Sequence, residues 1–207
     1  AAGAELLAQP GRHGIGICVG QADDLGGNVT GQARPKIDDL AAADFLAGNP
    51  TTTCSTLVLR RDVFRDCGLF DPTMTHSEDQ EWLFRVAISA WQIKGVRQAL
   101  VDYRTSPRGL AADLDKMQRG FETMLERARR HAPEIVARHE IAARAQEDCY
   151  LARRAVRLGL PRELTWRYLT RAVTAQPQLL WEAPRMTLGT ALLSLKRPLG
   201  PSHTMEA

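Results

Sequence analysis

The sequence predicts an α/β fold in its first half, a partial sheet with flanking helices, followed by an α-helical extension. Three observations predict this. Short apolar runs typical of strands occur at residues 15–19 and 54–59. An amphipathic helical pattern follows them, at residues 77–90. After residue 109 the apolar side chains recur at helical spacing, which predicts the extension.

The first apolar run is followed by a segment typical of a turn. Residues 23–28 contain two Asp, two Gly and one Asn, which are the residues that tight turns favour. Two adjacent carboxylates also suit a hard cation, but a hairpin turn explains the whole segment better than metal ligands at Asp23 and Asp24. The sequence therefore assigns no metal ligand in this chain.

Hydroxyl side chains gather where the second apolar run begins. Thr52 and Thr53 stand directly before the strand expected at residues 54–59. Such hydroxyls bind sugar hydroxyls or phosphate in some sites, and in others they bond to nearby backbone groups within a turn. Both interpretations stay open, so Thr52 and Thr53 are candidate substrate-binding residues.

A helix is expected to begin after Ser77. Ser77 and Gln80 have the spacing of a capping box, which places Glu78 and Asp79 in the first turn. Acidic residues there stabilise the helix dipole by about 0.3–1 kcal/mol, so a purely structural role is one interpretation of the pair.

Three more side chains of this helix carry expectations. Glu81 and Arg85 have the spacing of an ion pair on the solvated side of the helix. Trp82 falls on the apolar stripe and either packs in the core or stacks against the apolar face of a sugar. Trp82 is therefore a further candidate for substrate binding.

The extension is predicted to consist of paired helices. One helical stripe follows Gly109, and a second helix begins at Pro133 and ends at Gly159. Residues 151–177 are similar to one tetratricopeptide-type helical pair, although an ordinary helical hairpin is favoured because only one unit is visible. The predicted domains are residues 1–109, a helical extension over 110–182, and a short amphipathic segment with a flexible tail over 183–207.

The last apolar segment is too short to cross a membrane. Residues 186–195 form an apolar run of ten residues, whereas a spanning helix needs about 20. The segment either docks on the protein, which is favoured, or lies on a bilayer with Lys196 and Arg197 at the headgroups. Peripheral membrane association therefore stays open.

Composition limits the class of protein. Of 207 residues, 44% are hydrophobic and 25% are charged, as in an ordinary globular protein. Residues 1–110 hold 11 Lys or Arg against 13 Asp or Glu, and residues 111–207 hold 16 against 11. So small a positive excess argues against nucleic acid as a partner. The four cysteines lack paired spacing, which argues against zinc or a disulfide framework and favours a cytoplasmic location.

Five short motifs follow one another in a characteristic order. They are Gly48-Asn49 with residues 55–61, Phe64 with Gly68-Leu69-Phe70-Asp71, the pair Glu78-Asp79, the run Trp82-Leu83-Phe84-Arg85, and residues 100–104. Their order and spacing resemble the C-terminal part of family 2 glycosyltransferases. The resemblance covers about residues 6–108, and no single motif carries it.

This resemblance implies a nucleotide-sugar-binding fold of the GT-A type and an inverting transfer of a sugar to an acceptor hydroxyl. By position, Asp79 matches the general base of the family, and Glu78 is expected to orient the loop or bind substrate hydroxyls. Arg104, at the end of the last matched strand, is a further candidate for substrate binding. The His-containing segment that often follows in the family is replaced here by residues 105–108.

Other requirements of the family are expected outside this chain. The family holds a divalent cation, Mg²⁺ or Mn²⁺, with an Asp-x-Asp motif beyond a nucleotide-binding half, and neither precedes residues 15–19. The chain therefore resembles an N-terminally truncated fragment that is inactive alone. The complete enzyme is expected to use a nucleotide-diphospho-sugar donor and a glycan or lipid-linked acceptor, in the cytoplasm or at the cytoplasmic face of a membrane.

Two functions of different class follow. The first is an inverting glycosyltransferase, because one carboxylate suffices as base for a single displacement, whereas a hydrolase of the two-carboxylate type needs a second acid that the sequence does not mark. The second is a noncatalytic, tetratricopeptide-like interaction or scaffold protein, in which the transferase-like part only supports the fold.

Overall fold

The computed structural model describes residues 13–23, 29–32, 40–51, 53–104 and 109–196. The chain divides into two compact units, residues 1–140 and 141–207. The first unit combines a four-stranded sheet with helices, and the described part of the second is helical. This arrangement agrees with the predicted fold class at the level of a mixed first part and a helical extension. The helix after residue 109 belongs to the first unit.

Among the described residues, every strand lies before residue 105. The strands are β1 (His13–Asp23), β2 (Val29–Gln32), β3 (Leu57–Leu59) and β4 (Gln92–Arg104). The helices are α2 (Ala42–Leu46), α3 (Arg61–Cys67), α4 (Glu78–Ala87), α5 (Leu114–His131), α6 (Pro133–Leu158), α7 (Arg162–Ala175), α8 (Leu179–Glu182) and α9 (Leu188–Lys196). Two 3-10 turns, η1 (Cys54–Thr56) and η2 (Leu110–Ala112), lie in the same described part of the chain.

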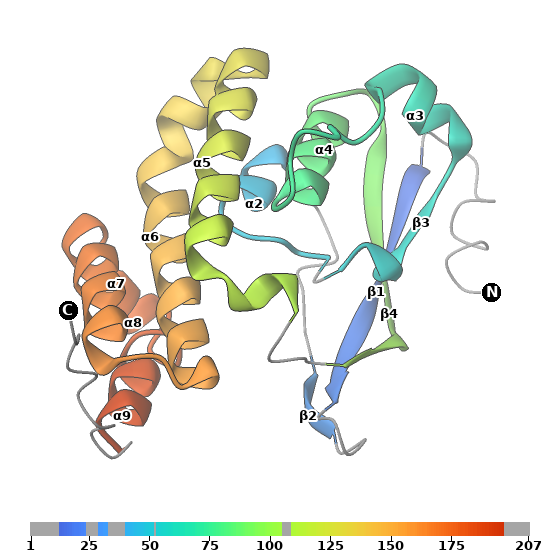
Figure 1. Ribbon diagram of the computed structural model, residues 1–207. Coiled ribbons are helices and arrows are strands. Elements are labelled where there is room, and N and C mark those ends of the chain that lie inside the picture. The colour runs from blue at the N-terminus through green and yellow to red at the C-terminus, as the bar shows by residue number, and fades with distance from the viewer. Residues whose placement is uncertain (1–12, 24–28, 33–39, 52, 105–108, 197–207) are drawn as a thin grey trace. The chain divides into compact units, whose positions relative to one another are not determined.

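Strand β1 is the centre of the sheet. Strand β4 runs parallel to β1 along one edge, with Ile15 opposite Ile93. Strands β3 and β2 pair antiparallel with the beginning and the end of β1 on its other edge. Figure 1 shows the long pair β1 and β4 side by side. Residues 24–91 supply the crossover connection that a parallel pair requires.

Two predictions about the strands have different outcomes. The consecutive strands β1 and β2 are antiparallel, as the predicted hairpin requires, while residues 24–28 of its turn lie outside the described residues. The strand predicted at residues 54–59 is shorter than expected. Its first residues, Cys54 to Thr56, form the turn η1, and only Leu57 to Leu59 pair with β1.

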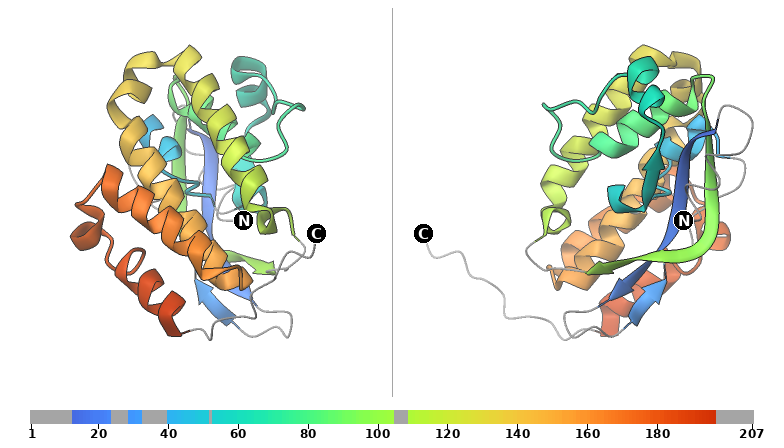
Figure 2. Two further views of the ribbon diagram at one scale, coloured as in Figure 1. Left: turned by 60° about the vertical axis from the view of Figure 1, so that its left-hand side comes forward. Right: turned by 90° about the vertical axis from the view of Figure 1, so that its right-hand side faces the viewer.

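Helix α4 lies at the centre of the packing in the first unit. Its side chains Trp82, Leu83, Phe84 and Val86 are fully buried, together with Phe45 and Leu46 of α2. Figures 1 and 2 show α2, α4 and α5 on the same side of the sheet, and α4 contacts both α2 and α5. The helix predicted within residues 77–90 is therefore confirmed, although it ends at Ala87. Its amphipathic pattern is not, because the consecutive residues 80–84 are all buried and Ala90 is exposed.

Trp82 fixes the segment that precedes α4. Its ring centroid lies 4.9 Å from that of Phe64 and 5.0 Å from that of Phe70. Its indole Nε1 donates a hydrogen bond of 2.7 Å to the carbonyl of Gly68. The side chain has no exposed surface, so it cannot stack against a sugar in this structure, and the prediction that Trp82 binds substrate is wrong. Trp82 packs in the core, which is the other interpretation of this residue.

The pair Glu81 and Arg85 forms, but not on the solvated side. Arg85 Nε lies 2.8 Å from Glu81 Oε1, and Glu81 is buried. Arg85 also donates to the carbonyls of Cys67 and Leu69. Gly68 between them has a positive φ of 77°, a conformation that glycine adopts without strain. The prediction of a solvated pair is wrong because the guanidinium binds this turn and covers its partner.

The predicted boundaries of the extension helices are partly correct. Helix α6 begins at Pro133 and is followed by Gly159, whose φ is 74°. Helix α5 begins at Leu114, later than the predicted stripe, because the Asp113 carboxylate accepts a hydrogen bond from the Lys116 backbone N–H and caps the helix there. Leu110, expected on the buried stripe, lies in η2 and is 75% exposed.

The second unit has its own small core. A buried cluster contains Ala145 and Cys149 of α6, Ala172 of α7 and Leu179 of α8, with Ala183 and Met186 packed against it. Arg171 Nε lies 3.2 Å from Asp148 Oδ2 beside this cluster. Among the described residues, none of the helices has the length and apolar character needed to cross a membrane.

Helix α5 approaches the segment before α4 very closely. A Cβ atom at Gly120 would lie 2.6 Å from Cβ of His76 and 2.7 Å from its carbonyl oxygen. Farther along α5, Arg127 forms an ion pair with Asp71 and donates a 3.1 Å hydrogen bond to Thr73 Oγ1. The absence of a side chain at residue 120 is therefore what allows this packing.

We expect Gly120→Ala to lower the free energy of unfolding by about 1–3 kcal/mol, because the added methyl overlaps backbone atoms of His76. This loss opposes the gain of up to about 1 kcal/mol that alanine normally brings to a helix. Urea denaturation followed by circular dichroism measures the change. Gly189→Ala in α9 is the matched control, because its nearest contact would be Pro184 O at 3.8 Å, and it should be neutral or stabilising. Equal effects of the two substitutions would contradict the packing argument.

Candidate functional site

The candidate site joins the loop at residues 48–56 to the first turn of α4. Asn49 Nδ2 donates a hydrogen bond of 2.7 Å to Asp79 Oδ2. The other amide atom, Asn49 Oδ1, accepts from the backbone N–H of Thr51 at 3.0 Å and from its hydroxyl at 2.6 Å. Because both ends of the amide are bonded, its orientation toward Asp79 is fixed.

The loop itself is held by a second threonine. Thr56 Oγ1 lies 2.6 Å from the Thr51 carbonyl and 2.7 Å from the Thr53 carbonyl, and both Thr51 and Thr56 are buried. For Thr51 and Thr56, the hydroxyls therefore act within the turn. Thr53 is half-buried and its carbonyl accepts from Thr56, while Thr52 lies outside the described residues.

The start of α4 differs from the predicted capping box. Ser77 is the N-cap residue, but its φ is 59° and its side chain makes no capping hydrogen bond. Gln80 Nε2 instead donates to the carbonyl of Phe45 at 2.6 Å, so it cannot reach back to Ser77. The capping-box prediction is wrong because the buried carbonyl of Phe45 takes the Gln80 amide. The placement of Glu78 and Asp79 in the first turn is confirmed.

The Asp79 carboxylate is half-buried and partly engaged. Its Oδ1 accepts from the backbone N–H of Gln80 at 2.8 Å, and its Oδ2 accepts from Asn49. The thiol of Cys54 lies 3.8 Å from the same Oδ2. An ionised carboxylate offers about four acceptor positions, so these three partners leave one, on Oδ1. The carboxylate lies at the start of α4, the positive end of the helix dipole.

The pKa of the Cys54 thiol reflects its burial and the charges around it. This pKa is raised to about 11, first by burial and then by the charges of Asp79 and Glu78. Both carboxylates thus act on one thiol. The site is anionic and holds Cys54 protonated at neutral pH, so this thiol is poorly suited to act as a nucleophile.

The sequence marks two members of this cluster, Glu78 and Asp79, and misses the roles of two others. In the sequence analysis, Asn49 is named only as part of a motif, and Cys54 only as the first residue of an expected strand. A signal for Asn49 exists, since Asn followed two residues later by Thr is typical of a side chain that closes a local turn. Cys54 carries no comparable signal, because its position depends on the turn η1.

The remaining predicted site residue, Arg104, is the last residue of β4, opposite Asp23 of β1. Its side chain lies outside what the structure describes, so its substrate-binding role stays a prediction. Among the described residues, no group of three or more His, Cys, Asp or Glu side chains is placed to hold a metal ion. The residues of this site therefore do not fit a divalent cation.

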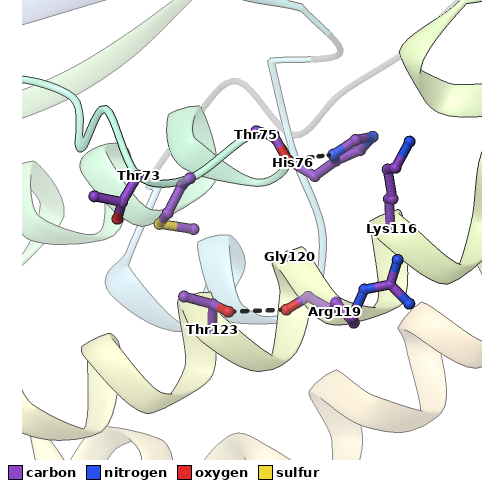
Figure 3. Close-up of a pocket in the computed structure, with 8 residues that line it drawn as sticks. Thr73, Thr75, His76, Lys116, Arg119, Gly120 and Thr123 are labelled. Atoms are coloured by element: carbon purple, nitrogen blue, oxygen red, sulfur yellow. Dashed lines mark hydrogen bonds between the residues drawn. The ribbon is translucent and has the colours of Figure 1, made fainter.

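A pocket of about 130 Å³ lies beside the segment that leads into α4. Its walls are Thr73, Met74, Thr75 and His76 on one side and Lys116, Arg119, Gly120 and Thr123 of α5 on the other. Figure 3 shows the side chains of His76, Lys116 and Arg119 gathered at one end. The pocket and the carboxylate site are close in the sequence, because His76 of the pocket wall precedes Asp79 by three residues.

The pocket carries positive charge. Lys116 Nζ pairs with Asp113 at 3.0 Å, whereas the Arg119 guanidinium has no ion-pair partner within the described part of the chain. The buried His76 ring is fixed between Thr75 Oγ1 and the Leu110 carbonyl, each at 3.1 Å. Two cations and several hydroxyls surround this small hollow, and the Asp113 carboxylate offsets one of the two charges. The remaining positive charge favours an anionic ligand group.

We expect Asp79→Asn to accelerate alkylation of Cys54 by iodoacetamide severalfold between pH 8 and 10. Burial is the largest cause of the raised pKa and remains, but loss of the Asp79 charge removes the second cause and so lowers the pKa from about 11. Each unit of pKa changes the thiolate fraction about tenfold. Mass spectrometry of the peptide containing Cys54 measures the rate. Asp62→Asn, on the exposed surface of α3, is the matched control. An unchanged or slower rate in Asp79→Asn would remove the basis for placing the two groups together.

Comparison with known proteins adds no relative to this geometry. No family model, no curated protein and no solved structure matches the chain.

Proposed function

We propose that the first unit is the acceptor-side part of an inverting glycosyltransferase of family 2 and GT-A type, with Asp79 as the general base. The observation that supports this most is the fixed Asp79 carboxylate, which Asn49 orients at 2.7 Å and which keeps one acceptor position on Oδ1. The ordered motifs from Gly48 to residue 104 supply the family assignment.

The proposed step is a single displacement. The acceptor hydroxyl oxygen attacks the anomeric carbon while Asp79 Oδ1 accepts its proton. The bond from the anomeric carbon to the phosphate oxygen breaks, and the nucleoside diphosphate leaves with the electron pair, so the configuration inverts. A positioned carboxylate contributes typically 10²–10⁴-fold to such a step. Asn49 and the Gln80 N–H keep Asp79 in one orientation throughout.

The other residues have supporting roles in this proposal. Glu78 binds sugar hydroxyls beside the base, and Thr53 borders the acceptor. The proposal also requires a nucleotide-diphospho-sugar donor and a Mg²⁺ or Mn²⁺ ion; we assign neither of them to the described residues, so no step here passes through the metal. The acceptor is a glycan or a lipid-linked glycan, and the reaction takes place in the cytoplasm or at the cytoplasmic face of a membrane.

The cationic pocket gives the substrate a second anchor. Lys116 and Arg119 lie on α5, directly across from the segment that leads to Asp79. We assign to them a phosphate or carboxylate group of the substrate, since charge-assisted hydrogen bonds to such groups are the strong ones. The base and the anion site are then held together by the contact of Gly120 with His76.

A noncatalytic scaffold is the second candidate. The observation that favours it is the helical second unit, whose helices α6 and α7 include the tetratricopeptide-like segment at residues 151–177. A donor screen on the complete polypeptide encoded by the gene, with and without Mg²⁺ or Mn²⁺, separates the two. Sugar transfer from any nucleotide-sugar supports the enzyme, and consistent failure supports the scaffold.

We expect Asp79→Asn in the complete polypeptide to lower kcat for sugar transfer by about 10²-fold or more, since the amide cannot accept the proton. The far-ultraviolet circular dichroism spectrum should not change, because the amide retains an acceptor oxygen for Asn49 or Gln80. Asp62→Asn is again the control and should keep full activity. Undiminished turnover in Asp79→Asn would exclude the base assignment.

We expect the double substitution Lys116→Ala with Arg119→Ala to weaken the binding of inorganic diphosphate to this chain by about tenfold, which corresponds to about 1.4 kcal/mol. Titration followed by nuclear magnetic resonance of the backbone amides measures the affinity. Arg138→Ala, which removes an exposed cation from a helix of the same unit, is the matched control. Equal affinities of the double variant and the control would show that the pocket is not the anion site.

A further inference from the structure

Helix α9 turns its polar side chains inward and its leucines outward. Thr190 and Ser194 are buried, as is Thr187 just before the helix. The exposed fractions of the leucines are 50% for Leu188, 58% for Leu192, 52% for Leu193 and 54% for Leu195. This is the reverse of an ordinary surface helix, which buries its apolar face.

The inward face is stabilised only weakly by polar contacts. Thr187 Oγ1 donates to the carbonyl of Ala183 at 3.1 Å, but the buried hydroxyl of Thr190 has no hydrogen-bond partner within the described residues. The inward face contacts α7. Small side chains permit this close contact, and the leucines are left on the opposite side.

Helix α8 of the same unit also exposes apolar side chains, with Trp181 69% exposed and Leu180 exposed as well. Several exposed apolar side chains on one small helical unit mark an interaction site, whereas single exposed leucines need no explanation. We call the surface formed by Leu180, Trp181, Leu188, Leu192, Leu193 and Leu195 the leucine–tryptophan face.

The charge around this face is positive. Residues 141–196 contain nine Lys or Arg and four Asp or Glu. Near the face itself, Arg185 and Lys196 are exposed at the two ends of the leucine run, and Glu182 is the one acid of residues 179–196. Cations at the edge of an apolar face, with a tryptophan beside it, suit the boundary between lipid headgroups and acyl chains.

We propose that the leucine–tryptophan face inserts into the surface of an anionic lipid bilayer. Helix α9 spans Leu188–Lys196, so at 1.5 Å per residue it is about 14 Å long, less than half of the hydrocarbon thickness of about 30 Å. It therefore lies in the plane of the membrane, with the leucines among the acyl chains and Lys196 and Arg185 at the phosphates. The second unit anchors the chain, and this role does not depend on the proposed transferase activity.

Vesicle co-sedimentation of the chain tests the proposal. We expect binding to vesicles of equal parts phosphatidylcholine and phosphatidylglycerol, and weaker binding to phosphatidylcholine alone. Leu188→Gln combined with Leu192→Gln should lower the partition coefficient by about tenfold or more, because two apolar side chains no longer enter the bilayer. Leu110→Gln is the matched control and should bind like wild type, since Leu110 is 75% exposed but lies in the first unit.

Tryptophan fluorescence provides a second, independent measurement. Transfer of Trp181 into lipid should shift the emission to shorter wavelength, and Trp181→Phe should remove the shift while the other three tryptophans remain. Wild-type binding equal to that of the double leucine variant would overturn the proposal. Absence of vesicle binding would also overturn the proposal. If sedimentation velocity then shows a dimer that the double leucine variant loses, the face binds a second copy of the chain; a monomer would leave the face without this role as well.

Discussion

The burial of Trp82 is the interaction on which the first unit depends. Its ring packs against Phe64 and Phe70, and its indole N–H binds the Gly68 carbonyl. One side chain therefore fixes both α4 and the turn that precedes it. Arg85, one helical turn farther along, binds the carbonyls on either side of Gly68 and completes the attachment. The position of the two acids at the start of α4 is a consequence of this packing.

The position of these two acids determines which groups they meet. The loop at residues 48–56 meets the helix start through Asn49, whose amide is held by Thr51 at its oxygen and by Asp79 at its nitrogen. A carboxylate that is held in this way, half-buried and hydrogen-bonded on both oxygens, keeps a defined direction, as the proposed role of a base requires. Across the same segment, α5 contributes two cations. The acids at the start of α4 and the cations of α5 thus both lie near the short segment that leads into α4.

The sequence predicts periodic elements well and polar contacts poorly, and the residues show why. Helix α4 follows from its apolar spacing, and the ends of α6 follow from Pro133 and Gly159, which act locally. The burial of Gln80 and Glu81 in α4 has no such local signal. Gln80 fails as a capping residue because a carbonyl 35 positions earlier, that of Phe45, takes its amide. Cys54 and Asn49 join the site through the turn η1, which depends on tertiary packing and leaves no periodic signal.

Ser77 enters α4 with a left-handed backbone, φ 59° and ψ 17°. This conformation costs a residue with a side chain about 1–2 kcal/mol, and the cost is highest for branched side chains. Position 77 can therefore accept Gly, Asn or Asp, but a change to Val, Ile or Thr would alter the path of the backbone and displace the two acids that follow. The φ angle of Ser77 thus helps to set the direction of the Asp79 side chain.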